Sequence, residues 1–114
     1  MNKPDKKVIL VVDDDADVRD SIFLYLNEIE DYSVMALDSA SEAINIIQKN
    51  NVDVVLTDIV MPEISGIELL EKIRQFNSQI PVILMTGFAD LDIAVAALKK
   101  GAFDFILKPF PTDY

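Results

Sequence analysis

The sequence predicts an α/β fold built on a doubly wound parallel sheet of five strands. Continuous apolar and β-branched runs, of which residues 8–12 are the clearest, are typical of strands buried on both faces. Between these runs lie segments with apolar residues three or four positions apart, which is the spacing of an amphipathic helix. Because strands and helices alternate along 114 residues, we expect right-handed crossovers within a single domain.

Five strands and four helices are expected in alternation. Two of the helix starts match a capping box, Ser39 with Glu42 and Ser65 with Glu68. The expected strands cover residues 8–12, 33–37, 52–56, 80–85 and 103–107, and the expected helices begin at residues 17, 39, 65 and 90.

The fourth helix has signals for both its end and its buried face. Two lysines in the last turn, followed by Gly101 in a left-handed conformation, are expected to end it. The apolar residues that it is expected to turn toward the sheet are Ile93, Ala94, Ala97 and Leu98.

The two ends of the chain are expected to differ from the rest. Residues 1–6 are interpreted as a loose arm and residues 7–114 as the domain, truncated before or within a fifth helix that Thr112 would cap. With helices on one side only, the sheet would expose apolar surface, since four large side chains under a fifth helix would contribute roughly 1.5–3 kcal/mol each. We therefore expect self-association, as a homodimer or by swapping.

Composition excludes several classes of protein. The net charge of −10 argues against direct binding to nucleic acid, which needs a basic surface. The chain has no cysteine and no histidine, which excludes disulfides, thiolate metal sites and histidine-based catalysis. No apolar run reaches the roughly 18–20 residues needed to span a membrane, and the polar start does not resemble a secretory signal. A cytoplasmic location is expected.

Polar residues that can carry chemistry follow four of the five expected strands. Because the carboxyl ends of parallel strands share one edge of the sheet, where such folds bind their ligands, these residues are expected to converge. They are Asp13, Asp14 and Asp15 after the first strand, Thr57 and Asp58 after the third, Thr86 after the fourth and Lys108 after the fifth.

This set of groups suits phosphoryl transfer assisted by a metal ion. Clustered carboxylates repel one another unless a cation lies between them, and hard oxygen ligands favour Mg²⁺. A carboxylate can also act as a nucleophile and form an aspartyl phosphate, whose oxygens a lysine and a threonine would neutralise and bind. Taken singly, each residue has a simpler interpretation: the three aspartates as the start of a helix, Asp58 as a turn cap, and Thr86 as the end of a strand.

Four motifs together resemble the signatures of response regulator receivers of two-component signalling, a family that includes the chemotaxis receivers. The similarity runs in the same order and spacing from about residue 7 to residue 110, and it implies a flavodoxin-like sheet of strand order 2-1-3-4-5. The motifs are Val11-Val12-Asp13-Asp14, Leu56-Thr57-Asp58-Ile59-Val60-Met61-Pro62, Leu84-Met85-Thr86-Gly87 and Leu107-Lys108-Pro109-Phe110.

The resemblance implies a role for each matching position. Asp58 would be the phosphoacceptor, and Asp13, Asp14, Asp58 and the Val60 backbone carbonyl would hold Mg²⁺, with Asp14 a more direct ligand than Asp13. The phosphoryl group would be bound by Thr86 and Lys108, the switch would involve Thr86 and Phe105, and the residue left as a helix cap is Asp15.

The resemblance also implies partners that this chain does not contain. Because the chain lacks histidine, its phosphoryl group would come from an external histidine kinase or phosphotransfer protein, docking near Arg19, Ser21 and Phe23. Residues 86–110 resemble receivers that precede AAA-type transcription activators, although hybrid kinases carry similar ones. Such a receiver assists only its own phosphorylation and dephosphorylation, and it changes the surface of the fourth helix and fifth strand to control an output domain or partner.

Two alternatives stay open. One is a degenerate receiver that serves only as an interaction module, against which the full set of site residues argues. The other is a haloacid-dehalogenase-type phosphatase that uses Asp13 and Asp15 after the first strand. That class needs a further acidic pair late in the chain, whereas only Asp113 follows Lys108.

Overall fold

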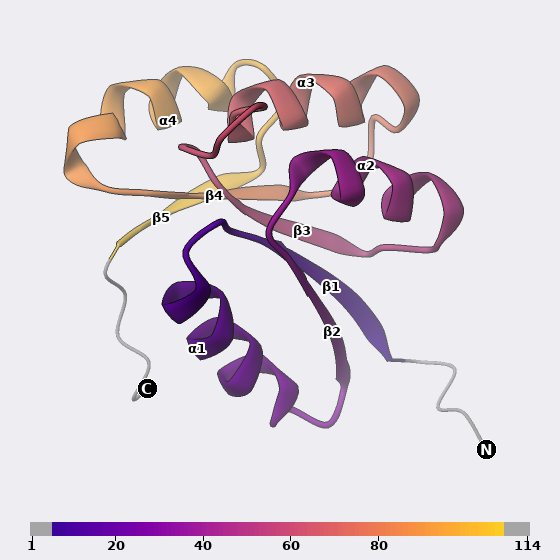
Figure 1. Ribbon diagram of the computed structural model, residues 1–114. Coiled ribbons are helices and arrows are strands. Elements are labelled where there is room, and N and C mark those ends of the chain that lie inside the picture. The colour runs from indigo at the N-terminus through magenta and orange to yellow at the C-terminus, as the bar shows by residue number, and fades with distance from the viewer. Residues whose placement is uncertain (1–5, 109–114) are drawn as a thin grey trace.

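The computed structural model describes residues 6–108, except for the side chain of Phe88, and shows five strands and four α-helices in strict alternation (Figure 1). A short 3-10 turn, Phe88–Asp90, precedes the last helix. The elements are β1 (Lys7–Val12), α1 (Ala16–Asn27), β2 (Tyr32–Leu37), α2 (Ala40–Lys49), β3 (Val54–Asp58), α3 (Gly66–Phe76), β4 (Val82–Thr86), α4 (Leu91–Leu98) and β5 (Asp104–Leu107).

The strands form one parallel sheet in the order β2-β1-β3-β4-β5, as the family resemblance implied. The chain first adds β2 on one side of β1 and then crosses to add β3 on the other side. The strand order therefore reverses between β1 and β3, where Val12 is in register with Thr57. This reversal places the residues that follow β1 beside the last residue of β3, which is where open α/β sheets bind ligands.

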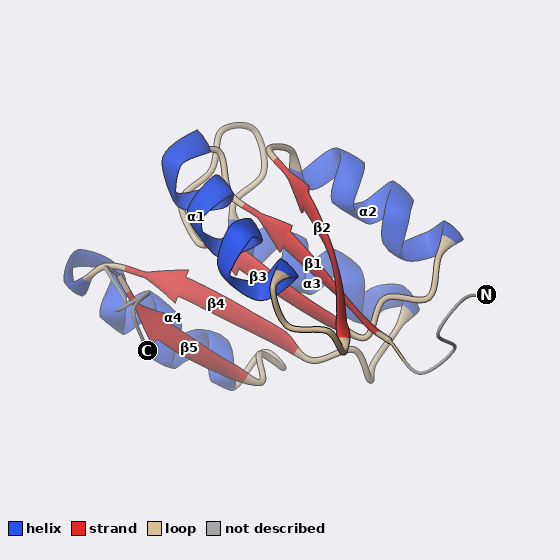
Figure 2. Cartoon of the chain, turned by 90° about the horizontal axis from the view of Figure 1, so that it is seen from below, coloured by secondary structure: helices blue, strands red, loops and turns tan. Residues whose placement is uncertain are grey.

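Helices cover both faces of the sheet, as expected for a doubly wound sheet. Helices α2, α3 and α4 pack on one face and α1 on the other, where α1 lies mainly over β1 and β2 (Figures 1 and 2). On the α1 face, Ile22 packs with Ile9, Val11, Leu56 and Met85. Alternate residues of each strand thus enter different cores, as the pleat requires.

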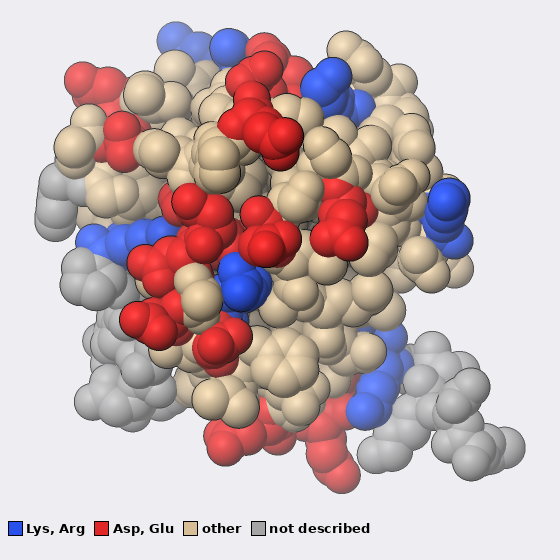
Figure 3. Space-filling view, in the orientation of Figure 1, with Lys and Arg blue, Asp and Glu red and all other residues tan. Residues whose placement is uncertain are grey.

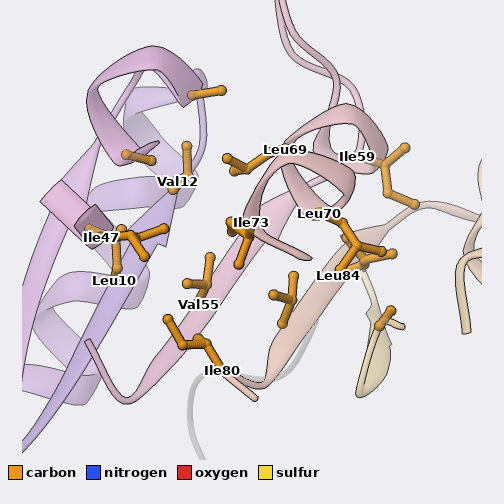
Figure 4. Packing of buried hydrophobic residues seen from close by; sticks show 14 of the residues in the cluster. Leu10, Val12, Ile47, Val55, Ile59, Leu69, Leu70, Ile73, Ile80 and Leu84 are labelled. Carbon is orange, nitrogen blue, oxygen red and sulfur yellow. The ribbon is translucent and has the colours of Figure 1, made fainter. Parts of the chain in front are cut away.

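The larger core lies between the sheet and helices α2, α3 and α4 (Figure 4). Strand residues Leu10, Val55 and Leu84 meet Leu70 and Ile73 of α3 there, and all five are fully buried. Strand β1 needs a continuous apolar run in this arrangement, because helices cover both of its faces.

Strands β3 and β4 begin two residues later than predicted, at Val54 and Val82. Buried Val52 and Ile80 belong to the apolar runs but precede the hydrogen-bonded ladder. Hydrophobicity reports burial, whereas a strand is defined by its pairing, so the two boundaries need not coincide. Both strands end on a site residue, Asp58 and Thr86.

The predicted buried face of α4 is wrong in part. Ala94 and Ala97 are buried, whereas Ile93 is 48% exposed and Leu98 is 40% exposed. Because this short helix is apolar nearly all round, its periodicity does not select one face. The helix also ends at Leu98, so both lysines follow it, and Gly101 has the expected positive φ of 106°.

The helix starts agree with most of the predicted caps. Ser65 and Glu68 form the full capping box, whereas only the serine half forms at Ser39, which accepts from the Glu42 N–H at 3.4 Å. Asp90 makes no side-chain cap, but Asp15 caps α1 as predicted. Each capped N–H would otherwise lack a partner in the first helical turn.

No helix in the described part of the chain is both long and apolar enough to cross a membrane. Most of the expected arm and the expected start of a fifth helix, with Thr112, fall in residues 1–5 and 109–114, outside the described residues.

Candidate functional site

Asp13 lies just beyond β1 and is fully buried. Its backbone N–H donates to the Leu37 carbonyl at 3.0 Å, which extends the pairing with β2 by one residue. Its Oδ1 accepts the Asp15 N–H at 2.9 Å, and its carbonyl accepts a bond from Arg19 Nη1 at 2.9 Å. A buried carboxylate needs such partners, because an unpaired one would be strongly destabilising.

Asp58 ends β3 at the centre of the same edge, with a side chain that is 14% exposed. Its carbonyl accepts the Thr57 hydroxyl at 3.1 Å, and α3 begins directly against it. A Cβ atom on Gly66 would lie only 2.1 Å from that carbonyl oxygen, so this position requires glycine. In the connecting loop Glu63 has a positive φ of 67°, which few residues other than glycine adopt.

Lys108 follows β5 and reaches both carboxylates. Its backbone N–H donates to the Thr86 carbonyl at 2.7 Å, which anchors the end of β5 to that of β4. Its Nζ lies 2.9 Å from Asp13 Oδ2 and 3.2 Å from Asp58 Oδ2. The ends of three strands therefore meet in one charged cluster, as the sequence predicted.

The charges in this cluster do not balance. Burial, and secondarily the negative charge of Asp13, raise the pKa of Asp58. Lys108 and the Val60 N–H act in the opposite direction but do not outweigh them. Burial alone would lower the pKa of Lys108, but its bonds and attraction to Asp13 and Asp58 raise it above 10.5. The site thus carries more negative charge than one lysine neutralises, which favours a further cation.

The residues present fit a Mg²⁺ ion. Asp13, Asp14 and Asp58 can each offer a ligand oxygen, and these oxygens all lie within 4.8 Å of one another. Both carboxylate oxygens of Asp13 already accept hydrogen bonds, one from the Asp15 N–H and one from Lys108 Nζ, whereas the side chain of Asp14 is exposed. Acidic side chains also gather around a basic one in the middle of the face in Figure 3. Hard oxygen donors without histidine or cysteine are the ligands that Mg²⁺ prefers.

Three further residues were predicted to take part in the site. Thr86 is buried at the end of β4, and its hydroxyl donates to the Gly87 carbonyl at 3.1 Å rather than to a carboxylate. Phe105 is half-buried against the larger core, and Val60 is 61% exposed. None of the three has a side chain bonded to Asp58, and their roles stay predictions.

Two residues that shape the site were not predicted as part of it. Gly66 was read only as part of a capping box, although a glycine at the first position of a helix is a weak sign of close packing. Arg19 was expected on the exposed, partner-facing side of α1, but its guanidinium binds the Asp13 carbonyl. No pattern in the sequence indicates that contact.

Comparison with known proteins assigns the chain to a family. Residues 9–114 match the family described as "Response regulator receiver domain". This chain is a response regulator receiver domain. It is 38% identical over 105 residues to the regulatory protein AtoC of Escherichia coli, covering 92% of this chain and 23% of that protein. It is also 38% identical to the transcriptional regulatory protein FixJ of Bradyrhizobium diazoefficiens, covering 92% of this chain and 51% of FixJ.

Solved structures agree with this assignment. The crystal structure of a receiver domain protein from Clostridium thermocellum has a TM-score of 0.86 and 37% sequence identity, covering 94% of this chain and 86% of that one. The receiver domain is thus a two-component signalling module rather than a conventional enzyme. Receiver domains bind Mg²⁺ at an acidic pocket, and Asp13, Asp14 and Asp58 form such a cluster in this chain.

Proposed function

We propose that this receiver domain accepts a phosphoryl group on Asp58. The observation that supports this role most directly is the setting of its carboxylate. It is partly exposed at the edge of the sheet, 3.2 Å from Lys108, and it shares a potential cation site with Asp13 and Asp14. Nucleophile, cation ligands and a fixed positive charge are the parts that phosphoryl transfer requires.

In the proposed reaction, an oxygen of Asp58 attacks the phosphorus of a phosphohistidine on a partner protein. The new P–O bond forms as the P–N bond breaks, and the departing electron pair returns to the imidazole nitrogen, which takes up a proton. Asp13, Asp14, Asp58 and the Val60 carbonyl would hold Mg²⁺, which when bound offsets charge on the phosphoryl oxygens. The donor histidine lies outside this chain, because the chain contains no histidine.

Lys108 and Thr86 supply the protein's own stabilisation of the phosphoryl group. Lys108 already lies between two carboxylates, so its ammonium can turn toward the new phosphoryl oxygens without entering the site from solvent. The Thr86 hydroxyl must leave the Gly87 carbonyl to donate to them. The space that it vacates would admit the ring of Phe105, and the surface of α4 and β5 would then change its binding preference.

The whole signalling protein is proposed from the relatives. AtoC and FixJ are regulatory proteins by name, and this chain spans less than a quarter of AtoC and about half of FixJ. We infer a histidine kinase or phosphotransfer protein as donor, a transcriptional output outside this chain, and a cytoplasmic location. The acidic charge argues against direct contact with nucleic acid. Self-association, as a homodimer or by swapping, is tested by light scattering, where a monomeric mass with ordinary thermal stability would contradict it.

Phosphorylation by a small donor tests the central proposal. With acetyl phosphate and Mg²⁺, the chain should gain the mass of one phosphoryl group, and Asp58→Asn should abolish the gain. Asp53→Asn is the matched control, because Asp53 directly precedes the start of the same strand, away from the site. If the wild type gains no mass, the proposal is wrong and the chain is an interaction module. If Asp58→Asn gains as much mass as the wild type, another residue accepts the phosphoryl group and the assignment to Asp58 is wrong.

The lifetime of the phosphoryl group is a separate proposal. Val60 is exposed next to the site, where its bulk would hinder an attacking water. Phe88, whose side chain lies outside the described residues, is proposed to act in the same way. Val60→Asn and Phe88→Ala should therefore shorten the half-life of the phosphorylated form. An unchanged half-life in both variants would rule this idea out.

A further inference from the structure

Arg19 links helix α1 to the edge of the sheet that carries the site. It lies one turn into α1, where its backbone N–H donates to the Asp15 carbonyl at 2.9 Å. Its side chain is half-buried and turns back, so that Nη1 donates to the Asp13 carbonyl at 2.9 Å. An arginine that only kept the helix soluble would extend into water instead.

The oxygen that Arg19 binds belongs to the peptide unit joining Asp13 to Asp14. A peptide unit is planar, so holding its oxygen also fixes the direction in which the chain enters Asp14. The other polar groups of Asp13 are held by Leu37, Asp15 and Lys108. Arg19 therefore completes a set of contacts that fixes Asp13 and the peptide bond after it.

Asp14 has no comparable anchor of its own. Its side chain is exposed, and among the described residues no hydrogen bond or ion pair holds its carboxylate. Even so, one of its oxygens lies within 4.8 Å of ligand oxygens of Asp13 and Asp58. The placement of Asp14 thus depends on its backbone, and its backbone depends on the peptide that Arg19 holds.

We propose that Arg19 is a positioning residue for the cation site: it fixes the Asp13–Asp14 peptide so that the Asp14 carboxylate faces a divalent cation. This inference rests on the proposed function, because it assumes that Asp14 is a Mg²⁺ ligand. Residues that orient metal ligands in this way typically change metal affinity by about tenfold or more when they are replaced.

The charge of Arg19 makes the inference easy to test, because charge and positioning act in opposite directions. A guanidinium near a cation site repels the cation, so its removal by itself would strengthen Mg²⁺ binding. Loss of positioning would weaken binding. The sign of the change therefore separates the two effects.

The experiment is calorimetric titration of Mg²⁺ into the full chain and its variants. Arg19→Met should bind Mg²⁺ about tenfold more weakly than the wild type. Arg19→Lys, which keeps a donor and the charge, should recover part of the loss. Lys49→Met is the matched control, because it removes an exposed cation at the far end of α2. It should bind as tightly as the wild type or slightly more tightly.

A spectroscopic signature distinguishes positioning from a general loss of structure. Without Mg²⁺, the carbonyl ¹³C resonance of Asp13 should move in Arg19→Met and return toward the wild-type position in Arg19→Lys. If the wild type binds no Mg²⁺, the proposed metal site fails and this inference fails with it. If the wild type binds but Arg19→Met binds as tightly or more tightly, or if the Asp13 resonance does not move, only this inference is overturned.

Discussion

The two ends of strand β3 carry the same residue type in two different settings. Asp53 precedes the strand, and its Oδ2 accepts the backbone N–H of Val8 at 2.8 Å. Asp58 ends the strand and faces the carboxylate of Asp13 and the ammonium of Lys108. The Asp53 carboxylate accepts a hydrogen bond from the backbone of a neighbouring strand, whereas the Asp58 carboxylate is repelled by the negative charge of Asp13.

This difference indicates how a structural carboxylate is distinguished from a functional one. The hydrogen bonds between Asp53 and Val8 stabilise the pairing of β3 with β1, and one of them occupies an oxygen of the Asp53 carboxylate. Burial and the charge of Asp13 raise the pKa of Asp58. The ionised Asp58 carboxylate therefore destabilises the folded chain unless a cation binds beside it. Asp53 at the start of β3 therefore stabilises the fold, whereas ionised Asp58 at its end lowers the stability of the fold at the proposed site of phosphorylation.

The largest effect on stability is expected at the Asp58 end, from Gly66→Ala. The new Cβ would lie 2.1 Å from the Asp58 carbonyl oxygen, so the start of α3 must move. We expect a loss of about 3 kcal/mol or more in the free energy of unfolding, measured by urea denaturation. Gly87→Ala is the matched control, because nothing lies within 4 Å of the Cβ that it would add. Equal effects of the two variants would contradict this prediction.

Lys108→Met should cause the next largest loss, about 2 kcal/mol at neutral pH, because buried Asp13 and partly buried Asp58 would face each other without a cation. The pKa of Lys108 is raised above 10.5, so its contribution is full below that pH and disappears as pH rises through the folded value. Urea denaturation with and without Mg²⁺ checks this, since Mg²⁺ should reduce the difference between variant and wild type. A loss that is the same in both conditions would argue against a shared cation site.

Asp53→Ala should cost about 1–2 kcal/mol, because the Val8 N–H would lose its acceptor where water reaches it only in part. Asp53→Asn keeps an oxygen that can accept this bond and should cost less. Neither variant should change phosphorylation by acetyl phosphate. A loss of phosphorylation in Asp53→Asn, at unchanged thermal stability, would show that the two ends of β3 are coupled.

The smallest effect, about 1 kcal/mol, has the opposite sign: Asp58→Asn should stabilise the chain at neutral pH without Mg²⁺. The pKa of Asp58 is raised from 3.8, so the folded state holds the proton longer than the unfolded state and wild-type stability falls as pH rises through that window. The gain of the variant should therefore be absent below about pH 3.8, grow with pH, and then level off. A variant less stable than the wild type at neutral pH would contradict this reading of the charges.

Sequence patterns predicted the architecture well because burial and pairing dictate residue type in a parallel sheet. Each of the five strands lies within two residues of its predicted start, including β3 at Val54 and β4 at Val82. The inward face of α4 was not predictable, because Ile93 and Leu98 are as apolar as the buried alanines beside them. Which of them faces the sheet depends on how the helix docks.

The candidate site was predicted in its membership but not in its contacts. Asp13, Asp58 and Lys108 were identified because each follows an apolar strand, and the ends of parallel strands must meet. The role of Arg19 depends on a side-chain conformation that turns back along α1, and that of Gly66 on the closeness of α3 to Asp58. The order of residues gives no signal for the Arg19 contact and only a weak one, a glycine at the start of a helix, for Gly66.

By itself, the sequence determined which side chains stand at the end of each strand, because the alternation of buried strands and amphipathic helices admits few arrangements. Only the tertiary structure decided what those side chains face. Lys108 and Asp13 are 95 positions apart in the chain, yet packing holds their charged atoms 2.9 Å apart. Asp53 and Asp58 are chemically identical, and they differ because Coulomb forces and burial depend on distance in space rather than along the chain.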